Sequence, residues 1–117
     1  MSRKLLTVTK NHLFRRAYSK GTPYVSQSVA VYVLKSGREA SRVGITVSTK
    51  RGNAVVRSRT RRIIREALRE LMPSVIPGRI LIVVARQGAV GKKSTQISGE
   101  LALIFKKAGL LVSEARS

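Results

Sequence analysis

Arginine residues recur at every fourth position in one stretch of this chain. Arg57, Arg61, Arg65 and Arg69 stand one helical turn apart within the sequence KRGNAVVRSRTRRIIREALR, which begins at Lys50. Like charges at this spacing destabilise a helix by roughly a few tenths of a kcal/mol per pair, so a partner outside the helix is needed to favour the row. Guanidinium groups donate planar pairs of hydrogen bonds to phosphate oxygens. The spacing therefore predicts a surface that binds a polyanion.

The charge of the whole chain agrees with this prediction. The 117 residues include 24 lysines and arginines but 5 acids, which gives a formal net charge of +19. Such a balance is typical of proteins that bind nucleic acid. The hydrophobic fraction of 43% is high enough for a packed core, which excludes a disordered basic tail. A solvated charged face, partly neutralised by Glu66 and Glu70, is the weaker alternative because of the repulsion within the row.

The residues that could perform hydrolysis are few. The chain has one histidine, no cysteine and no aspartate, and its acids are Glu39, Glu66, Glu70, Glu100 and Glu114. A two-metal nuclease needs convergent carboxylates, and acid–base cleavage needs a paired proton donor and acceptor. Glu66 and Glu70 stand beside Arg62 and Arg69, so we expect them to form local charge pairs. We therefore predict no catalytic residue and no metal ligand in the protein.

Hydrophobic periodicity places the arginine row on the second of three predicted helices. The 3.6-residue pattern predicts helices over residues 10–19, 54–72 and 95–108. Runs of β-branched and aliphatic residues predict strands over residues 29–34, 43–48 and 80–85, with one more short strand over 23–26. This order predicts a single-domain α+β fold over residues 1–117, with about three helices on a small, mostly antiparallel sheet of about four strands. Residues 1–6 and 112–117 are expected to be flexible ends.

The strand patterns predict how the sheet is covered. The polar segment KSGREASR between the first two long strands predicts a hairpin. In the second of these strands, the pleat places Gly44, Thr46 and Ser48 on one face and valine and isoleucine on the other. Whether Tyr32 shares the polar face depends on the strand register. The strand ILIVVA is almost wholly apolar, which predicts a central position covered on both faces.

The N-terminus and the hydropathy of the chain favour the cytoplasm. The first ten residues contain no apolar core of a signal peptide, and no apolar run approaches the length of a membrane span. We therefore expect a cytoplasmic protein with no membrane partner.

An ordered set of residues resembles the signature of the bacterial ribonuclease P protein family. It comprises the run VSTKRGNAV from Val47, then Arg57-Ser58-Arg59, Arg61-Arg62 and Arg65-Glu66. The resemblance extends to Phe14 and Tyr18 before Lys20-Gly21, to Tyr32, and to the strand ILIVVAR. The family has Arg-Asn-Arg where this chain has Ser58 between two arginines, and a hydroxyl can still contact a phosphate.

The resemblance implies both a fold and a function. The fold is an α-β sandwich with a left-handed β-α-β crossover, against the usual right-handed default, similar to a domain of ribosomal and translation proteins. Members of the family bind the catalytic RNA of ribonuclease P and help it remove the 5′ leader of precursor tRNA. Hydrolysis then depends on Mg²⁺ held mainly by the RNA subunit.

The resemblance also implies two sets of site residues. The expected contacts to the catalytic RNA are Lys50, Arg51, Asn53, Arg57, Ser58, Arg59, Arg61, Arg62 and Arg65. The expected leader-binding cleft comprises Phe14, Tyr18, Tyr32, Thr46 and Ser48. Aromatic rings there can stack on unpaired bases without reading sequence. On the residues alone, a place in the hydrophobic core is the favoured interpretation of Phe14 and Tyr18.

Two other classes of nucleic-acid-binding protein fit part of the pattern. A structural ribosomal protein would share the charge and the fold, but it would not need three aromatic residues lining one groove. A DNA-binding module would mix asparagine, glutamine and serine into its recognition helix, whereas this helix presents mainly arginine. We therefore expect the catalytic RNA and precursor tRNA as partners, and no DNA.

Overall fold

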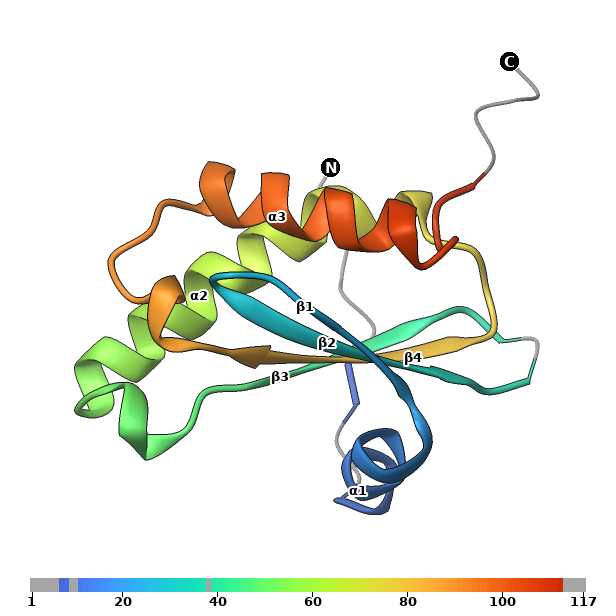
Figure 1. The fold of residues 1–117 in the computed structure, drawn as a ribbon, viewed down its shortest axis with the longest axis horizontal. Helices are drawn as coiled ribbons and strands as arrows, with labels where there is room; N and C mark the ends of the chain where they lie inside the picture. The colour runs from blue at the N-terminus through green and yellow to red at the C-terminus, as the bar shows by residue number, and fades with distance from the viewer. Residues whose placement is uncertain (1–6, 9–10, 38, 113–117) are drawn as a thin grey trace.

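A four-stranded sheet lies between one helix and a pair of helices (Figure 1). The computed structural model describes residues 7–8, 11–37 and 39–112. Its main elements are α1 (Asn11–Lys20), β1 (Thr22–Val25), β2 (Val29–Lys35), β3 (Arg42–Thr46), α2 (Ala54–Leu71), β4 (Arg79–Ala85) and α3 (Ser94–Lys107). Three short 3-10 helices join them: η1 (Thr49–Arg51), η2 (Met72–Ser74) and η3 (Gln87–Ala89). Every predicted element is present, although the predicted first residue of α1, Lys10, lies outside the described residues. So do the expected flexible ends 1–6 and 112–117, except for Val112, whose backbone N–H donates to the carbonyl oxygen of Ser74 at 2.6 Å.

The order of the strands is β1-β2-β4-β3. β2 pairs antiparallel with both β1 and β4, whereas β3 runs parallel to β4. The prediction of an α+β fold with a small, mostly antiparallel sheet is therefore confirmed. The left-handed sense of the β3-α2-β4 crossover stays a prediction, since order and direction do not specify a hand.

The predicted hairpin between β2 and β3 is wrong, because β4 lies between these two strands. Leu34 of β2 is opposite Ile80 of β4, and Ile80 is in turn opposite Arg42 of β3. β4 has the most apolar sequence of the four strands. The centre of the sheet suits it, because backbone partners on both sides and helices on both faces bury most of its side chains. The central, doubly covered position predicted for β4 is confirmed.

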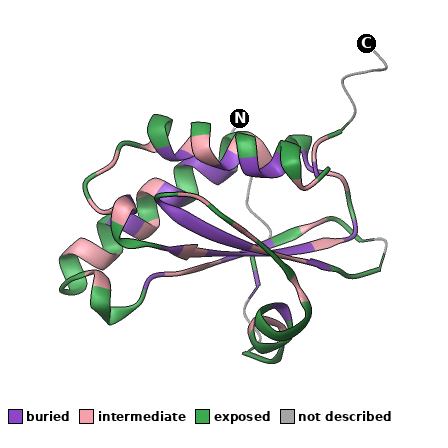
Figure 2. Cartoon of the chain, viewed as in Figure 1, coloured by how far each residue is buried: buried purple, intermediate pink, exposed green. Residues whose placement is uncertain are grey.

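The larger part of the core lies between the sheet and the α2–α3 pair. Figure 2 shows the buried residues concentrated in the sheet and on the inner sides of these helices. The main contributors include Val31, Val43, Ile64, Leu68, Leu81 and Phe105. Burial of such a side chain contributes roughly 1.5 to 3 kcal/mol. The apolar stripe predicted for the second helix is thus the face of α2 that packs on the sheet.

A smaller cluster lies on the opposite face of the sheet, under α1. Ala17 is fully buried there, against Leu34, Ile80 and Ile82. Because α1 is short, it covers this face only in part, and Tyr32 and Thr46 beside it remain partly exposed. Among the described residues, no helix is both long and apolar enough to cross a membrane.

Candidate nucleic-acid interface

The strand register determines which residues share the face of the sheet that α1 covers. Tyr32 of β2 is opposite Ile82 of β4, which is opposite Gly44 of β3. Residues opposite one another in a sheet point to the same face. Tyr32 therefore shares the α1 face of the sheet with Gly44 and Thr46, which resolves the question that the sequence alone left open.

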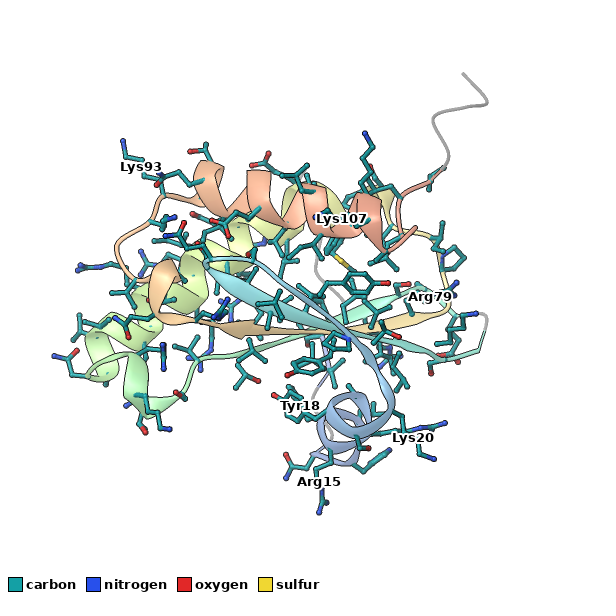
Figure 3. The ribbon with its side chains drawn as sticks, viewed as in Figure 1. Arg15, Tyr18, Lys20, Arg79, Lys93 and Lys107 are labelled. Atoms are coloured by element: carbon teal, nitrogen blue, oxygen red, sulfur yellow. The ribbon has the colours of Figure 1, made fainter. Side chains whose placement is uncertain are left out.

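Tyr18 connects α1 to this face of the sheet. Its hydroxyl oxygen lies 3.2 Å from Oγ1 of Thr46. Its ring meets the ring of Tyr32 edge to face, with centroids 5.1 Å apart and planes at 85°. Figure 3 shows Tyr18 lying between α1 and the sheet, and 41% of the residue is exposed. The structure thus brings three of the five predicted cleft residues together, with an aromatic ring partly open to solvent.

Phe14 occupies a more enclosed place than Tyr18. It is half-buried and packs against the cluster under α1. Its ring lies so close to Gly44 that a Cβ there would be 2.7 Å from its Cζ atom and 3.1 Å from Cδ1 of Ile82. Phe14 therefore packs against the sheet beside Tyr18, and this contact requires glycine at position 44.

We expect Gly44→Ala to destabilise the fold by about 1 to 3 kcal/mol, because the added methyl group overpacks this contact. In an ordinary strand the same change stabilises by roughly 0.5 to 1 kcal/mol. A loss of stability in Gly44→Ala would therefore indicate the close contact with Phe14. Urea unfolding measures the difference. Gly99→Ala in α3 is the matched control, since no atom lies within 4 Å of a Cβ at that position. A Gly44→Ala protein as stable as the parent would contradict the close packing of Phe14.

Two predicted site residues, Ser48 of the leader cleft and Asn53 of the surface for the catalytic RNA, shape the backbone that leads into α2. Oγ of Ser48 accepts a hydrogen bond from the backbone N–H of Lys50 at 3.3 Å, and Oδ1 of Asn53 accepts one from Val56 at 3.0 Å. Ser48 and Asn53 are thus the N-caps of η1 and α2. Such a cap contributes about 1 kcal/mol. The contact of Ser48 is with η1 and not with Tyr18 or Thr46. Each cap uses only the side-chain oxygen as an acceptor, so the hydroxyl group of Ser48 and the amide NH₂ group of Asn53 can still donate hydrogen bonds to a ligand.

The arginine row winds around α2 and does not follow one face. Four residues turn a helix by about 400°, so each arginine is displaced about 40° from the one before. The exposures follow this drift: Arg57 and Arg61 are half-buried, whereas Arg65 and Arg69 are exposed. Nε of Arg57 donates to the carbonyl oxygen of Gly52 at 3.2 Å, which ties the first arginine to the loop before the helix.

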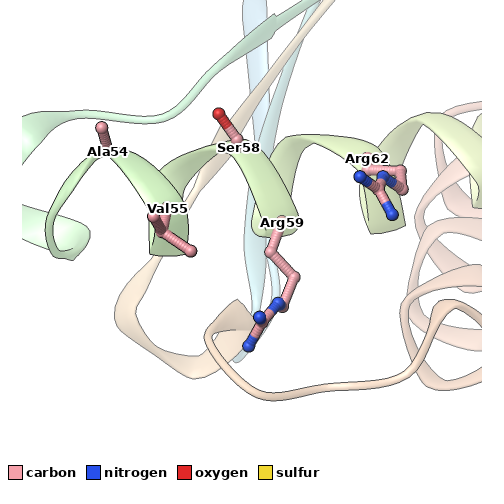
Figure 4. Close-up of a pocket in the computed structure, with 5 residues that line it drawn as sticks. All are labelled: Ala54, Val55, Ser58, Arg59 and Arg62. Atoms are coloured by element: carbon pink, nitrogen blue, oxygen red, sulfur yellow. The ribbon is translucent and has the colours of Figure 1, made fainter.

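A shallow depression of about 370 Å³ lies on the exposed side of α2 (Figure 4). Ala54, Val55, Ser58, Arg59 and Arg62 line it. The two guanidinium groups and the hydroxyl group of Ser58 are donors suited to phosphate oxygens. Val55 was not predicted, although 64% of it is exposed beside these donors. Val55 could have been identified in the sequence as an apolar residue within a run of basic residues.

Arg51 contacts a part of the chain that sequence reasoning missed. Its Nη1 atom donates to Oε1 of Gln87 in η3 at 3.2 Å. Its Nε atom is shielded from solvent and has no hydrogen-bond partner among the described residues. No local signal predicts this contact, because Gln87 lies 36 residues further along the chain.

The charge pairing predicted for Glu66 and Glu70 is wrong. Within the part of the chain that the structure describes, the ion pairs are Arg42–Glu39 at 4.0 Å and Lys92–Glu100 at 3.5 Å. Glu66 and Glu70 are both exposed, where water competes with an ion pair and holding two long side chains together costs entropy. The arginines of α2 thus have no acidic partner among the described residues, and their charge remains available to a ligand.

Together these features define a class: a strongly basic α+β sandwich with an arginine-rich helix on one side of its sheet and a pair of contacting tyrosines on the other. A family model described as Ribonuclease P matches residues 2–109. The chain therefore belongs to the ribonuclease P protein family.

Relatives cover almost the whole chain. The ribonuclease P protein component of Clostridium acetobutylicum is 34% identical over 112 residues, which are 94% of each chain. That of Clostridium novyi is 39% identical over 105 residues, 88% of this chain and 93% of the relative. The solved RNase P protein of Staphylococcus aureus is 33% identical, has a TM-score of 0.79, and aligns over 92% of this chain and 99% of its own. The resemblance found in the sequence is thus confirmed.

Proposed function

We propose that this chain is the protein subunit of ribonuclease P, and that it binds both the catalytic RNA and the 5′ leader of precursor tRNA. Full-length similarity to proteins named as ribonuclease P protein components supports the first part. The observation that carries the RNA contact is the set of arginines on α2 without acidic partners among the described residues. Each can neutralise a phosphate and release a counterion.

The part of the sheet beside α1, where Tyr18, Tyr32 and Thr46 meet, is the proposed site for the leader. Tyr18 and Tyr32 offer aromatic surface for unpaired bases, and Thr46 adds a hydroxyl group. β3 ends at Thr46 and leads through η1 directly into α2. A leader bound at Thr46 would therefore lie close to Lys50 and Arg51, where the surface proposed for the catalytic RNA begins.

Hydrolysis is assigned to the catalytic RNA and its Mg²⁺ ions. Mg²⁺ prefers carboxylate, phosphate and water oxygens. Among the described residues, no three acidic, histidine or cysteine side chains form a group that could hold a metal ion. In this proposal the protein binds the leader and neutralises charge, and it acts in the cytoplasm.

Reconstitution with the cognate catalytic RNA tests the proposal. We expect the purified protein to lower the Mg²⁺ concentration needed for leader removal, because its cations replace part of the counterion atmosphere. Cleavage of a labelled precursor tRNA is measured across a Mg²⁺ titration with and without protein. An unchanged titration would contradict the proposal. A pull-down from cells should recover one abundant non-ribosomal RNA, whereas recovery of ribosomal RNA would indicate a structural ribosomal protein.

A further inference from the structure

Glu100 of α3 is held in a cage of hydrogen bonds. Its Oε1 atom accepts from Oγ of Ser26 at 2.6 Å and from the backbone N–H of Ser28 at 2.9 Å, and its Oε2 atom accepts from Oγ of Ser28 at 2.6 Å. Nζ of Lys92 lies 3.5 Å from Oε2, and 21% of the Glu100 side chain is exposed. Burial raises the pKa of Glu100, but the hydrogen bonds and Lys92 outweigh it, so the pKa lies below its usual value. The cage therefore holds a carboxylate at neutral pH.

The turn that Glu100 holds packs directly against η3. The backbone N–H of Arg86 donates to the carbonyl oxygen of Ser28 at 2.8 Å. At Gly88 the two backbones approach so closely that a Cβ would be 2.4 Å from the carbonyl oxygen of Gln27. Lys92 follows η3, so Glu100 contacts the chain after this short helix directly and is linked to Arg86, before the helix, through Ser28.

η3 in turn holds Arg51. Gln87 is its first residue, and its Oε1 atom is the acceptor for Nη1 of Arg51 at 3.2 Å. The Nε atom of Arg51 makes no hydrogen bond among the described residues, so Gln87 is the polar contact that orients this guanidinium group. A continuous series of contacts therefore runs from Glu100 through the β1–β2 turn and η3 to Arg51.

We propose that Glu100 and Gln87 are positioning residues that orient Arg51 for the catalytic RNA. The inference rests on the proposed function, in which Arg51 contacts that RNA. According to this inference, the acidic residue Glu100 favours the binding of a polyanion, the catalytic RNA. Charge alone has the opposite effect, because removal of a carboxylate raises the net charge of +19 by one.

Filter binding of the catalytic RNA at several salt concentrations tests this inference. We expect Glu100→Ala to weaken binding about fivefold at 0.15 M salt and to lower the salt slope by roughly 0.7 to 0.9, as when the protein neutralises one phosphate fewer. Glu100→Gln removes the same charge but keeps an oxygen that accepts from Ser28, so its loss of affinity should be smaller. Gln87→Ala leaves the charge unchanged and alters an exposed side chain, and it should weaken binding by a factor similar to that of Glu100→Ala.

The Arg51→Ala background separates positioning from general stability. If Glu100 acts through Arg51, then Glu100→Ala causes no further loss of affinity once Arg51 is absent. Equal losses in both backgrounds, or tighter binding by Glu100→Ala and Gln87→Ala in the parent, would overturn the inference. Circular dichroism confirms folding, and should Glu100→Ala fail to fold, Gln87→Ala in the two backgrounds decides. Failure of the unaltered protein to bind the RNA would instead contradict the proposed function.

Discussion

Reversal of Arg61 and Arg65 together to glutamate is expected to weaken binding of the catalytic RNA by at least about 20-fold at 0.15 M salt. Counterion release at that concentration is worth roughly a factor of 5 per neutralised phosphate, and the new carboxylates add repulsion. The slope of log K against log salt should also become flatter, by about 0.7 to 0.9 for each phosphate that the protein no longer neutralises. Electrophoretic mobility shift across a salt series measures both quantities.

A charge-matched variant separates local binding from net charge. Lys106 and Lys107 are exposed at the end of α3, and their reversal to glutamate changes the net charge by the same amount. We expect this control to weaken binding much less, because these lysines lie on a different helix. Equal effects of the two double variants would show that only the total charge matters. Thermal unfolding is needed as well, since Arg61 is half-buried.

Replacement of Tyr18 by alanine is expected to reduce the affinity of the reconstituted holoenzyme for precursor tRNA by about 1 to 3 kcal/mol. This is the range for removal of one ring on which a base stacks. Affinity for mature tRNA should change little, because that ligand has no leader. The measurement is the ratio of the two dissociation constants, which does not depend on how much of the protein is active.

Tyr18→Phe is the control for this substitution. It keeps the ring and removes the hydroxyl group that lies 3.2 Å from Oγ1 of Thr46. We expect it to retain most of the preference for precursor tRNA. If Tyr18→Ala weakens both tRNAs equally, or if Tyr18→Phe is as harmful as alanine, the ring does not stack on the leader. Phe14 is less suited to this test because its packing against Gly44 couples binding to stability.

The bounds of the helices and strands were predictable because they depend on local patterns. The apolar stripe of α2 and the capping groups near its start are visible within a few residues of one another. The pairing of the strands was not predictable in the same way. The polar segment between β2 and β3 indicates a turn whether these strands pair with each other or are separated by a third strand. Nothing within the segment shows that β4, more than 30 residues further on, lies between them.

The same distinction between local patterns and distant contacts applies to the candidate site. The basic residues of α2 were recognisable from spacing and charge, and the predicted cleft residues Tyr18, Tyr32 and Thr46 lie together in the structure. The pairing of Glu66 and Glu70 was predicted wrongly, since proximity along a helix does not produce an ion pair when both partners are well hydrated. The functions of these residues in binding RNA stay predictions until the variants are measured.

Local sequence patterns account for the α+β class, the positions of the helices and strands, and the concentration of arginine on one helix, because periodicity and charge are properties of neighbouring residues. Three features are visible only in the folded chain: Tyr32 faces α1, Gln87 holds Arg51, and Glu100 is bound by a turn lying 74 residues earlier in the chain. The cost of closing a loop rises slowly with its length, so local sequence scarcely distinguishes one distant partner from another. Packing of the whole core makes that choice.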